Sequence, residues 1–280
     1  MGELDARGII SAVEIAVYVP ILLTSLVLVK RHGFKRQGGW IYLLIFSLVR
    51  VVAASVHIAA EVNDPTDSTL QTIYTTLEGV GLAPLLGATV GFLGTVSQNG
   101  LDRIPLVSRG NKILGLLSLV ALALTVAGGA IAGSAKTEDR VNTGTNLRHI
   151  GIILFAVQYG LIVLMDGYFW ANKEQIMKHR RTLLLGITLA LPFLGVRMLY
   201  AILSAFAPAS VPGSPPRSGG LSKFNSQTGP WEIYLVMSVI AEFVTVLIYT
   251  IVGVITPLKK DYAVGNREAD DEQTMSLKPL

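Results

Sequence analysis

The sequence predicts an all-α integral membrane protein with a bundle of seven transmembrane helices, and three observations support this fold class. The chain of 280 residues is 51% hydrophobic and only 15% charged, whereas soluble domains carry about 25% charged residues. Its mean hydropathy is +0.55. The hydrophobic residues form seven stretches, each long enough to cross roughly 30 Å of hydrocarbon as a helix. The stretches cover residues 9–29, 40–60, 71–96, 113–133, 149–170, 183–206 and 231–256.

The composition also excludes other classes of protein. The apolar content is too high for a disordered chain, and the low charge argues against an ordinary soluble enzyme. The absence of cysteine excludes disulfide scaffolds, thiolate metal sites and cysteine catalysis. The stretches are too long for barrel strands and do not alternate with period two. Helices satisfy all of their own backbone polar groups within the membrane, so helices are expected.

The first stretch is predicted to be a retained span rather than a cleaved signal peptide. The residues before it, 1–8, are acidic on balance, and its basic residues follow it. A signal peptide has the opposite order, with basic residues first. This order predicts a translocated N-terminus.

Basic residues in the connecting segments predict the same orientation. Cytosolic loops are enriched in lysine and arginine. Fourteen such residues follow the first, third, fifth and seventh stretches, and only six lie in the other set of segments. The N-terminus is therefore expected outside or in a lumen, and the C-terminus in the cytosol. The six outer residues are Arg7, Lys136, Arg140, Arg148, Arg217 and Lys223.

The connections leave little room for a soluble domain, so residues 1–257 are predicted to form one transmembrane domain. The longest connection, 207–230, is rich in proline, serine and glycine and is expected to be an extended loop. Residues 258–280 are polar and are predicted to be a disordered cytosolic tail. The plasma membrane or the endoplasmic reticulum is the expected location.

Ionisable residues inside the stretches are the candidate functional residues. A charge within a transmembrane helix costs about 2.5–3.5 kcal/mol on insertion scales, so each one is expected to have a function or a partner. Five lie deep when depth is measured with a rise of about 1.5 Å per residue, while His57 and Asp166 lie nearer the ends of their stretches. The five are Glu14, Arg50, Glu78, Arg197 and Glu242.

Helical spacing places these residues on faces shared with other polar side chains. Arg50 and His57 are seven residues apart, and Arg197 and Tyr200 are three apart. Lipid offers such faces no partners, so they are expected to face the interior of the bundle. Together they predict a polar cavity that opens toward the outer side and is closed near Arg50 and Glu242. Other members of these faces are Glu61, Gln71, Tyr18, Tyr74, Ser204, Trp231, Ser238, Thr245 and Tyr249.

Two interpretations of the buried charges remain open. In the first, they pair and clamp the helices together. In the second, two arginines and three carboxylates line a site for a ligand or for protons. The count favours the second, because one carboxyl has no arginine and would be neutral, or paired by His57 or a ligand. The pairs expected in the first interpretation are Arg50 with Glu242, and Arg197 with Glu78 or Glu14.

Proline and glycine are expected to shape the bundle. Pro84 and Pro192 lie inside the third and sixth stretches and are predicted to kink them. Glycines in the third and fourth stretches favour close helix packing over a hinge. These glycines are Gly79, Gly81, Gly87, Gly91, Gly94, Gly128, Gly129 and Gly133.

The sequence predicts neither a metal nor a cofactor. The last stretch has no lysine for a retinal Schiff base, and the four histidines are scattered. P-loop and nucleophile-elbow motifs are missing. Nucleic acid is not expected as a partner, because the basic residues are dispersed as topological anchors. Membrane lipid and a small-molecule ligand are the expected partners, and the oligomeric state is left open.

The run Leu191–Tyr200 (LPFLGVRMLY), the pair Phe224–Asn225, the pair Glu242–Phe243 and Tyr249 resemble a family of uncharacterised seven-span membrane proteins of filamentous fungi. The resemblance covers most of the chain and implies a fungal membrane protein without an established activity. The architecture is also similar to fungal lipid-translocating exporter-like proteins and to small membrane-bound terpene cyclases. These last two similarities depend on architecture alone.

Three functional hypotheses follow. The leading one is a protein that binds or translocates a small lipophilic or anionic molecule. In it, Arg50 and Arg197 hold the negative group, and Glu14, Glu78 and Glu242 gate or exchange protons. His57 and Tyr200 complete the expected ligand-binding set. The first alternative is a membrane-embedded enzyme of secondary metabolism, such as a terpene cyclase or isomerase, with Glu78 or Glu242 as the acid. The second is a seven-helix receptor-like sensor.

Overall fold

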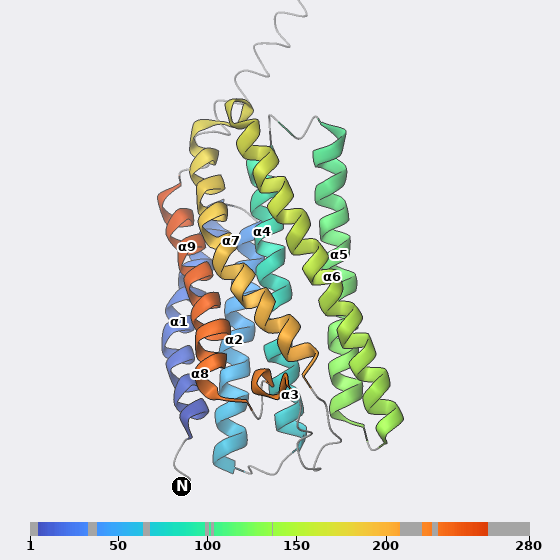
Figure 1. Cartoon of the computed structure of the whole chain (residues 1–280). Coiled ribbons are helices and arrows are strands. Elements are labelled where there is room, and N and C mark those ends of the chain that lie inside the picture. The colour runs from blue at the N-terminus through green and yellow to red at the C-terminus, as the bar shows by residue number, and fades with distance from the viewer. Residues whose placement is uncertain are drawn as a thin grey trace, which may run out of the picture.

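The computed structural model describes residues 5–32, 38–63, 68–98, 101, 104–135, 137–207, 220–225 and 229–256. Within these ranges all regular structure is helical, and seven helices are long and apolar enough to cross a membrane (Figure 1). The predicted all-α fold with seven spans is confirmed. The predicted tail, 258–280, and most of the 207–230 connection lie outside the described residues.

Five of the spans are single helices, and two are divided. The undivided spans are α1 (Ala6–His32), α2 (Gly38–Asn63), α5 (Pro105–Gly133), α6 (Glu138–Ala171) and α7 (Lys178–Ala205). The third span consists of α3 (Ser68–Val80) and α4 (Leu82–Ser97). The seventh consists of α8 (Trp231–Tyr234), the π-helical η4 (Leu235–Ile240) and α9 (Ala241–Ile255). Two short 3₁₀ helices, η2 (Lys173–Gln175) and η3 (Ser222–Phe224), lie in the connections.

The helices form a ring around α4. Neighbouring pairs around the ring are α1 with α2, α2 with α3, α3 with α5, α5 with α6, α6 with α7, α7 with α9, and α9 with α1. The helix α4 also contacts α2, α5, α6 and α7, and 72% of the third span is buried, against 22–50% for the other spans. In Figure 1, α5 and α6 lie side by side at one edge of the bundle. The third span is therefore the one most enclosed by protein.

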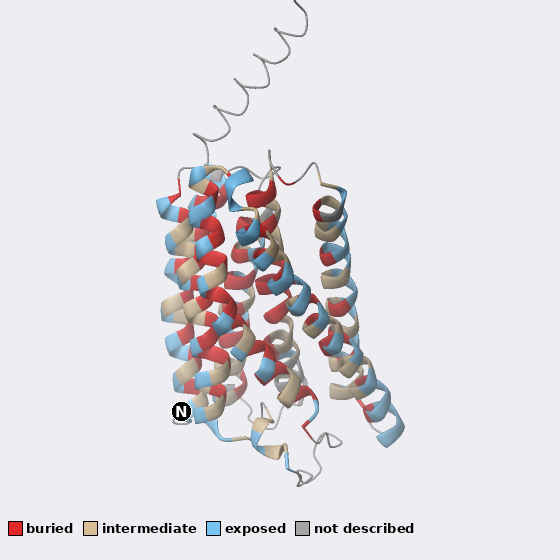
Figure 2. Ribbon diagram, turned by 45° about the horizontal axis from the view of Figure 1, so that its top comes forward, coloured by how far each residue is buried: buried red, intermediate tan, exposed pale blue. Residues whose placement is uncertain are grey.

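The outer surface of the bundle is apolar, and the polar groups lie inside. Figure 2 shows buried residues on the inward faces of the helices and exposed residues on the outward faces. Many exposed side chains are large hydrophobic ones, such as Leu164 at 71% exposure and Leu119 at 64%. The deeply buried residues include Glu14, Arg50 and Glu242. This inside-out distribution is the one expected of a bundle surrounded by lipid.

The third span is broken at Gly81 and is not continuous as the hydrophobic stretch predicted. Pro84 explains the position of the break, because its ring collides with the carbonyl four residues earlier, at Val80, and it has no N–H to donate there. The backbone N–H of Gly81 keeps the α-helical bond to the carbonyl of Leu77, at 3.2 Å, and also bonds that of Glu78 at 3.3 Å, and the backbone angles of Gly81 stay helical (φ −54°, ψ −30°). By contrast, α7 runs as one helix through Pro192.

Glycine allows α5 and α6 to approach closely, as predicted for Gly128. A Cβ on Gly128 would lie 2.5 Å from the carbonyl oxygen of Gly144, and a Cβ on Gly144 would lie 2.5 Å from the backbone nitrogen of Ala132. Such distances are too short for any larger residue, so these backbones are in direct contact. Gly79 differs, because a Cβ there would meet no atom within 4 Å.

Candidate functional site

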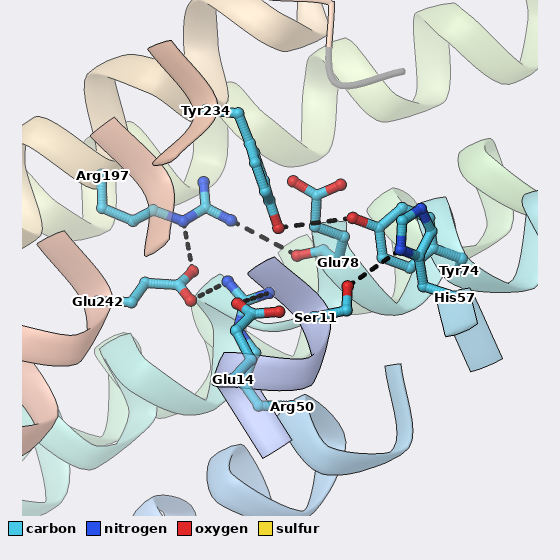
Figure 3. Close-up of polar contacts among 9 residues, drawn as sticks. All are labelled: Ser11, Glu14, Arg50, His57, Tyr74, Glu78, Arg197, Tyr234 and Glu242. Atoms are coloured by element: carbon cyan, nitrogen blue, oxygen red, sulfur yellow. Dashed lines mark hydrogen bonds and ion pairs between the residues drawn. The ribbon is translucent and has the colours of Figure 1, made fainter. Parts of the chain in front are cut away.

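Two arginines from different helices converge on Glu242. Arg50 of α2 donates from Nη2 to one carboxylate oxygen, and Arg197 of α7 donates from Nε to the other (Figure 3). The three side chains are at most 3% exposed. We call Arg50, Arg197 and Glu242 the central triad. It links α2, α7 and α9 in the interior of the bundle, where the ion pairs are shielded from water and lipid.

Glu14 of α1 lies beside the central triad. One of its carboxylate oxygens is 3.9 Å from Nη1 of Arg50, which is an ion pair but too long for a hydrogen bond. That oxygen, Glu14 Oε1, has no hydrogen-bond partner in the described part of the chain. The charge of Glu14 is therefore balanced through space rather than by a direct bond.

The central triad lies against the third span at Gly81, where the absence of a side chain leaves space for the guanidinium of Arg50. A Cβ on Gly81 would lie 3.6 Å from Nε of Arg50, in ordinary contact, so a side chain larger than that of alanine would crowd the guanidinium. Arg197 reaches the same break, because its Nη2 donates to the backbone carbonyl of Glu78 at 3.4 Å. Pro84, Gly81 and the two arginines are thus parts of one local arrangement.

A small polar cavity lies on the other side of Arg197, among α3, α5, α6 and α7. Its volume is about 30 Å³. A buried water needs roughly 10–15 Å³ on this measure, so the cavity can hold about two waters or a polar group of similar size. The residues that line it are Glu78, Gly79, Thr125, Arg148, Ile152, Arg197, Tyr200, Ala201 and Ser204. We call it the Glu78 cavity.

Several polar groups of the Glu78 cavity have no bonded partner among the residues that the structure describes. Within the described residues, no hydrogen bond or ion pair is made by the Arg148 guanidinium, by the hydroxyls of Tyr200 and Ser204, or by the Glu78 carboxylate. In Figure 3, dashed lines reach both oxygens of Glu242, but none reaches the carboxylate of Glu78. Buried polar groups normally have partners. A site with this many open groups can accept a polar ligand.

A cluster of aromatic and polar side chains lies between Glu78 and the end of the bundle where α1 begins. His57 lies against Tyr74 with ring centroids 4.2 Å apart, and its Nδ1 is 3.0 Å from the hydroxyl of Ser11. The hydroxyl of Tyr74 donates to that of Tyr234 at 3.5 Å. In Figure 3 both tyrosines lie next to Glu78. These residues form the wall between the carboxyl and that end of the bundle.

The structure divides the predicted ligand-binding residues into three groups. Glu78, Arg197 and Tyr200 line the Glu78 cavity. Arg50 and Glu242 form the central triad with Arg197, and Glu14 lies beside it. His57 lies apart from both, with Ser11, Glu61 and Tyr74. Asp166 is separate again, where its carboxylate accepts from the hydroxyl of Thr188.

The predicted pairing was right for Arg50 and wrong for Arg197. Arg50 does bond Glu242, but Arg197 bonds Glu242 as well, and not the carboxylate of Glu78 or Glu14. The physical reason is that one carboxylate has two oxygens and can accept from two guanidiniums at once. The result is one doubly bonded glutamate, Glu242, and two glutamates, Glu14 and Glu78, whose carboxylates accept no hydrogen bond from an arginine of the described residues.

Arg148 was assigned to an outer connection by the sequence, and this assignment is corrected. The helix α6 begins at Glu138, not near residue 149, so Arg148 lies about 15 Å into it at a rise of about 1.5 Å per residue. A signal was available: Thr137 followed by Glu138 and Asp139 is typical of a helix start. The central triad, Glu14 and the Glu78 cavity therefore together have three arginines and three glutamates, and the argument from an unequal count no longer holds.

Seven membrane-length helices around buried ion pairs and a polar cavity define a multi-pass membrane protein. The sequence profile of a protein family described as "Domain of unknown function (DUF7702)" matches residues 4–260. The chain therefore belongs to the DUF7702 family, and the expectation of an uncharacterised family is confirmed. No curated protein and no solved structure matches the chain.

Proposed function

We propose that this protein binds or translocates a small lipophilic or anionic molecule through the Glu78 cavity. The observation that carries the proposal is the set of open polar groups inside a bundle surrounded by lipid. Polar groups without partners are costly in such a place, and sites for small molecules commonly combine an apolar wall with a few convergent polar groups. Ile152 and Ala201 supply apolar wall, and Arg148 supplies the charge.

The two arginines of the leading hypothesis have different parts in this proposal. Arg197 lines the cavity and contributes to binding the negative group, together with Arg148. Arg50 is engaged by Glu242 and Glu14 and acts as a positioning residue. Glu78 is the group proposed to exchange protons, because its carboxylate lies on the cavity. Glu242 is left with a structural part, since both of its oxygens are bonded.

Ligand-dependent thermal stabilisation of the purified protein tests this proposal. The probes are hexanoate, hexyl phosphate, hexylamine, hexanamide and hexanol, which differ only in the polar group. A ligand that binds only the folded state raises the unfolding temperature with its concentration. We expect at least one probe to do so in the wild type and in Arg140→Gln, and not in Arg148→Gln. Arg140 is the matched control, because it lies exposed on the same helix.

The proposal fails if every probe leaves the unfolding temperature unchanged, or if stabilisation is the same in Arg148→Gln as in the wild type. Each variant is first compared with the wild type by size-exclusion chromatography, so that a folding defect is not taken for a binding defect. Arg148→Lys keeps the charge and is used where Arg148→Gln does not fold.

A membrane-embedded enzyme is the second candidate, and the open carboxyl of Glu78 favours it over Glu242. A carboxyl in an enclosed cavity can act as a general acid, whereas Glu242 already accepts from two guanidiniums. Metabolite extracts of a host that makes the wild type or Glu78→Gln test this candidate, with plausible precursors supplied. A product that requires Glu78 would support the enzyme, and identical extracts from folded proteins would count against it.

We further propose that the N-terminus faces the outside or a lumen and that the C-terminus is cytosolic, in the plasma membrane or the endoplasmic reticulum. The excess of basic residues in one set of connections supports this orientation. The chain has no cysteine, so single cysteines at Lys136 and at Lys173, which is exposed in the connection between α6 and α7, can be labelled without background. An impermeant maleimide should label Lys136→Cys in intact cells and Lys173→Cys only after permeabilisation. The reverse pattern would overturn the orientation.

A further inference from the structure

Within the described residues, the charges of the central triad, Glu14 and the Glu78 cavity balance before any ligand is present. Three guanidiniums, from Arg50, Arg148 and Arg197, face three carboxyls, from Glu14, Glu78 and Glu242. The guanidinium of Arg7 also faces Glu78, but Arg7 lies at the start of α1 with its own acidic neighbour, Asp5. An added anion would leave the set with one negative charge in excess. An uncompensated charge inside a membrane protein is costly, so an anion is expected to bring a proton with it.

Glu78 is the carboxyl best placed to accept that proton. Glu242 is bonded to two guanidiniums, and Glu14 is 3.9 Å from one. Glu78 alone of the three lines the cavity, and its Oε2 has no hydrogen-bond partner within the described residues. A protonated Glu78 would have an O–H to donate to an anion beside it.

The size and the donors of the cavity favour a carboxylate over other anions. The room for about two waters matches the two oxygens of a carboxylate. A phosphate group has more oxygens and a second charge, and the second cation of the lining, Arg197, is already bonded to Glu242. The Arg148 guanidinium and the hydroxyls of Tyr200 and Ser204 are open donors, and guanidinium–carboxylate bonds are among the strongest hydrogen bonds in proteins.

We propose that the Glu78 cavity binds the carboxylate of a monocarboxylic acid, and that Glu78 takes up one proton from solvent as the anion binds. The inference rests on the proposed function, because it names the ligand class of the same site. The proton ends on a carboxyl oxygen of Glu78, and its O–H donates to the ligand, so the net charge of the site does not change. Arg148 donates to the same ligand carboxylate.

Charged and titratable side chains surround Glu78 on several helices. Any of these side chains that exchanged a proton when a ligand binds would contribute to the measured proton uptake. The test therefore compares Glu78→Gln with the wild type. The charged and titratable groups that face Glu78 are Arg7 and Glu14 from α1, Arg50 from α2, Tyr74 from α3, Arg148 from α6, Arg197 and Tyr200 from α7, and Tyr234 from α8.

Titration calorimetry of the purified full-length protein with hexanoate tests the inference. The titration is done at pH 7 in two buffers of different ionisation enthalpy, and the difference in heat gives the protons taken up per bound hexanoate. We expect one proton for the wild type and for Arg140→Gln. We expect none for Glu78→Gln, which should still bind hexanoate, because glutamine is neutral and can donate an N–H. Arg148→Gln should bind at least tenfold more weakly.

Three results would overturn the inference. They are hexanoate binding without proton uptake in the wild type, unchanged proton uptake in Glu78→Gln, and equal binding of hexanamide and hexanoate. If hexanamide or hexyl phosphate binds through Arg148 and hexanoate does not, the inference fails while the proposed function stands. If no probe binds to folded protein, both fail.

Two further arms of the experiment complete it. Acetate alongside hexanoate shows the source of the carboxylate: equal affinity supports a water-soluble acid, and binding of hexanoate alone supports an acid dissolved in the membrane. Gly79→Val is the second variant, because a side chain at Gly79 enters open space beside the cavity. It should remove hexanoate binding without unfolding the protein, and retained binding would place the ligand elsewhere and overturn the inference.

Discussion

Glu242 and Glu78 are two buried carboxylates on opposite sides of Arg197, and their surroundings differ in kind. Glu242 receives both of its hydrogen bonds from guanidiniums and has no exposure at all. The carboxylate of Glu78 lies on a cavity and receives no hydrogen bond from a described residue. The difference teaches that buried charge in one membrane bundle can serve packing at one position and leave a site open at the next.

A clamp and a site would be formed by different residues of this bundle. The central triad has the geometry of a clamp, since it ties α2, α7 and α9 together. The Glu78 cavity has the geometry of a site, since its polar groups face one small space. Arg197 belongs to both the central triad and the lining of the Glu78 cavity. A substitution in the central triad is therefore expected to alter the cavity through the side chain of Arg197.

The largest effect is expected from exchanging the charges of Arg50 and Glu242 in one double variant. In a simple pair this exchange would restore stability. Here Arg50→Glu places a carboxylate beside Glu14, and Glu242→Arg places a guanidinium beside Arg197. We expect no monodisperse protein after extraction in detergent, as judged by size-exclusion chromatography. Recovery of wild-type yield would show that Glu242 has only one important partner.

Single substitutions of Arg50 and Arg148 should have the next largest effects, and they should differ in how much stability the protein loses. Arg50→Gln leaves the buried Glu242 with one partner fewer, and removing one member of a buried ion pair costs about 3–5 kcal/mol. Arg148→Gln breaks no bond within the described residues and should change the free energy of unfolding by less than about 1 kcal/mol. Thermal unfolding in the same detergent measures both. Equal losses would contradict the division between the two regions.

Substitutions of Gly79 and Gly81 in the third span should differ in stability by a smaller amount. Gly81→Val would crowd the guanidinium of Arg50 and the carbonyl of Glu78, and overpacking of this kind costs about 1–3 kcal/mol. Gly79→Val meets open space and should leave the unfolding temperature almost unchanged. The control is Gly160→Val, where a Cβ also meets no atom within 4 Å. A Gly79→Val protein less stable than Gly81→Val would show that there is no open space beside Gly79 for a larger side chain.

The smallest effect is expected at Asp5, away from both carboxylates. Its carboxylate accepts from the backbone N–H of Gly8 at 2.9 Å and of Arg7 at 2.7 Å, which caps the start of α1. Partial burial raises the pKa of Asp5, but the hydrogen bonds, led by that from Gly8, hold it below its ordinary value. Asp5→Ala should cost about 0.5–1 kcal/mol at neutral pH.

The pH dependence of the Asp5 cap follows from the direction of that shift. A lowered pKa in the folded state means that the cap stabilises the protein at neutral pH. Its contribution is lost as the pH falls below the ordinary aspartate value of 3.8 and through the lower folded value. Unfolding temperatures of the wild type and Asp5→Ala should therefore differ at pH 7 and converge as the pH falls through the lowered pKa of Asp5 in the folded state. A difference that grows in acid would contradict the cap.

The sequence predicted the spans because hydrophobic length is a local property of the chain. It also located Glu14, Arg50, Glu78, Arg197 and Glu242 as buried charges, because each stands out against an apolar stretch. The sequence could not predict that Arg50 and Arg197 both bond Glu242, because this pairing depends on how far α2 and α7 lie from α9. It missed Arg148, because hydropathy marks the apolar part of a helix and α6 starts eleven residues earlier than the predicted span, at Glu138.

We infer that Glu242 holds the bundle together and that Glu78 serves the cavity. Thermal unfolding of Glu242→Gln and Glu78→Gln beside the wild type, each with and without hexanoate, tests this division of roles. We expect Glu242→Gln to lose about 3 kcal/mol or more of its free energy of unfolding. Glu78→Gln should keep wild-type stability and should still be stabilised by hexanoate. A stable Glu242→Gln together with an unfolded Glu78→Gln would contradict this division of roles.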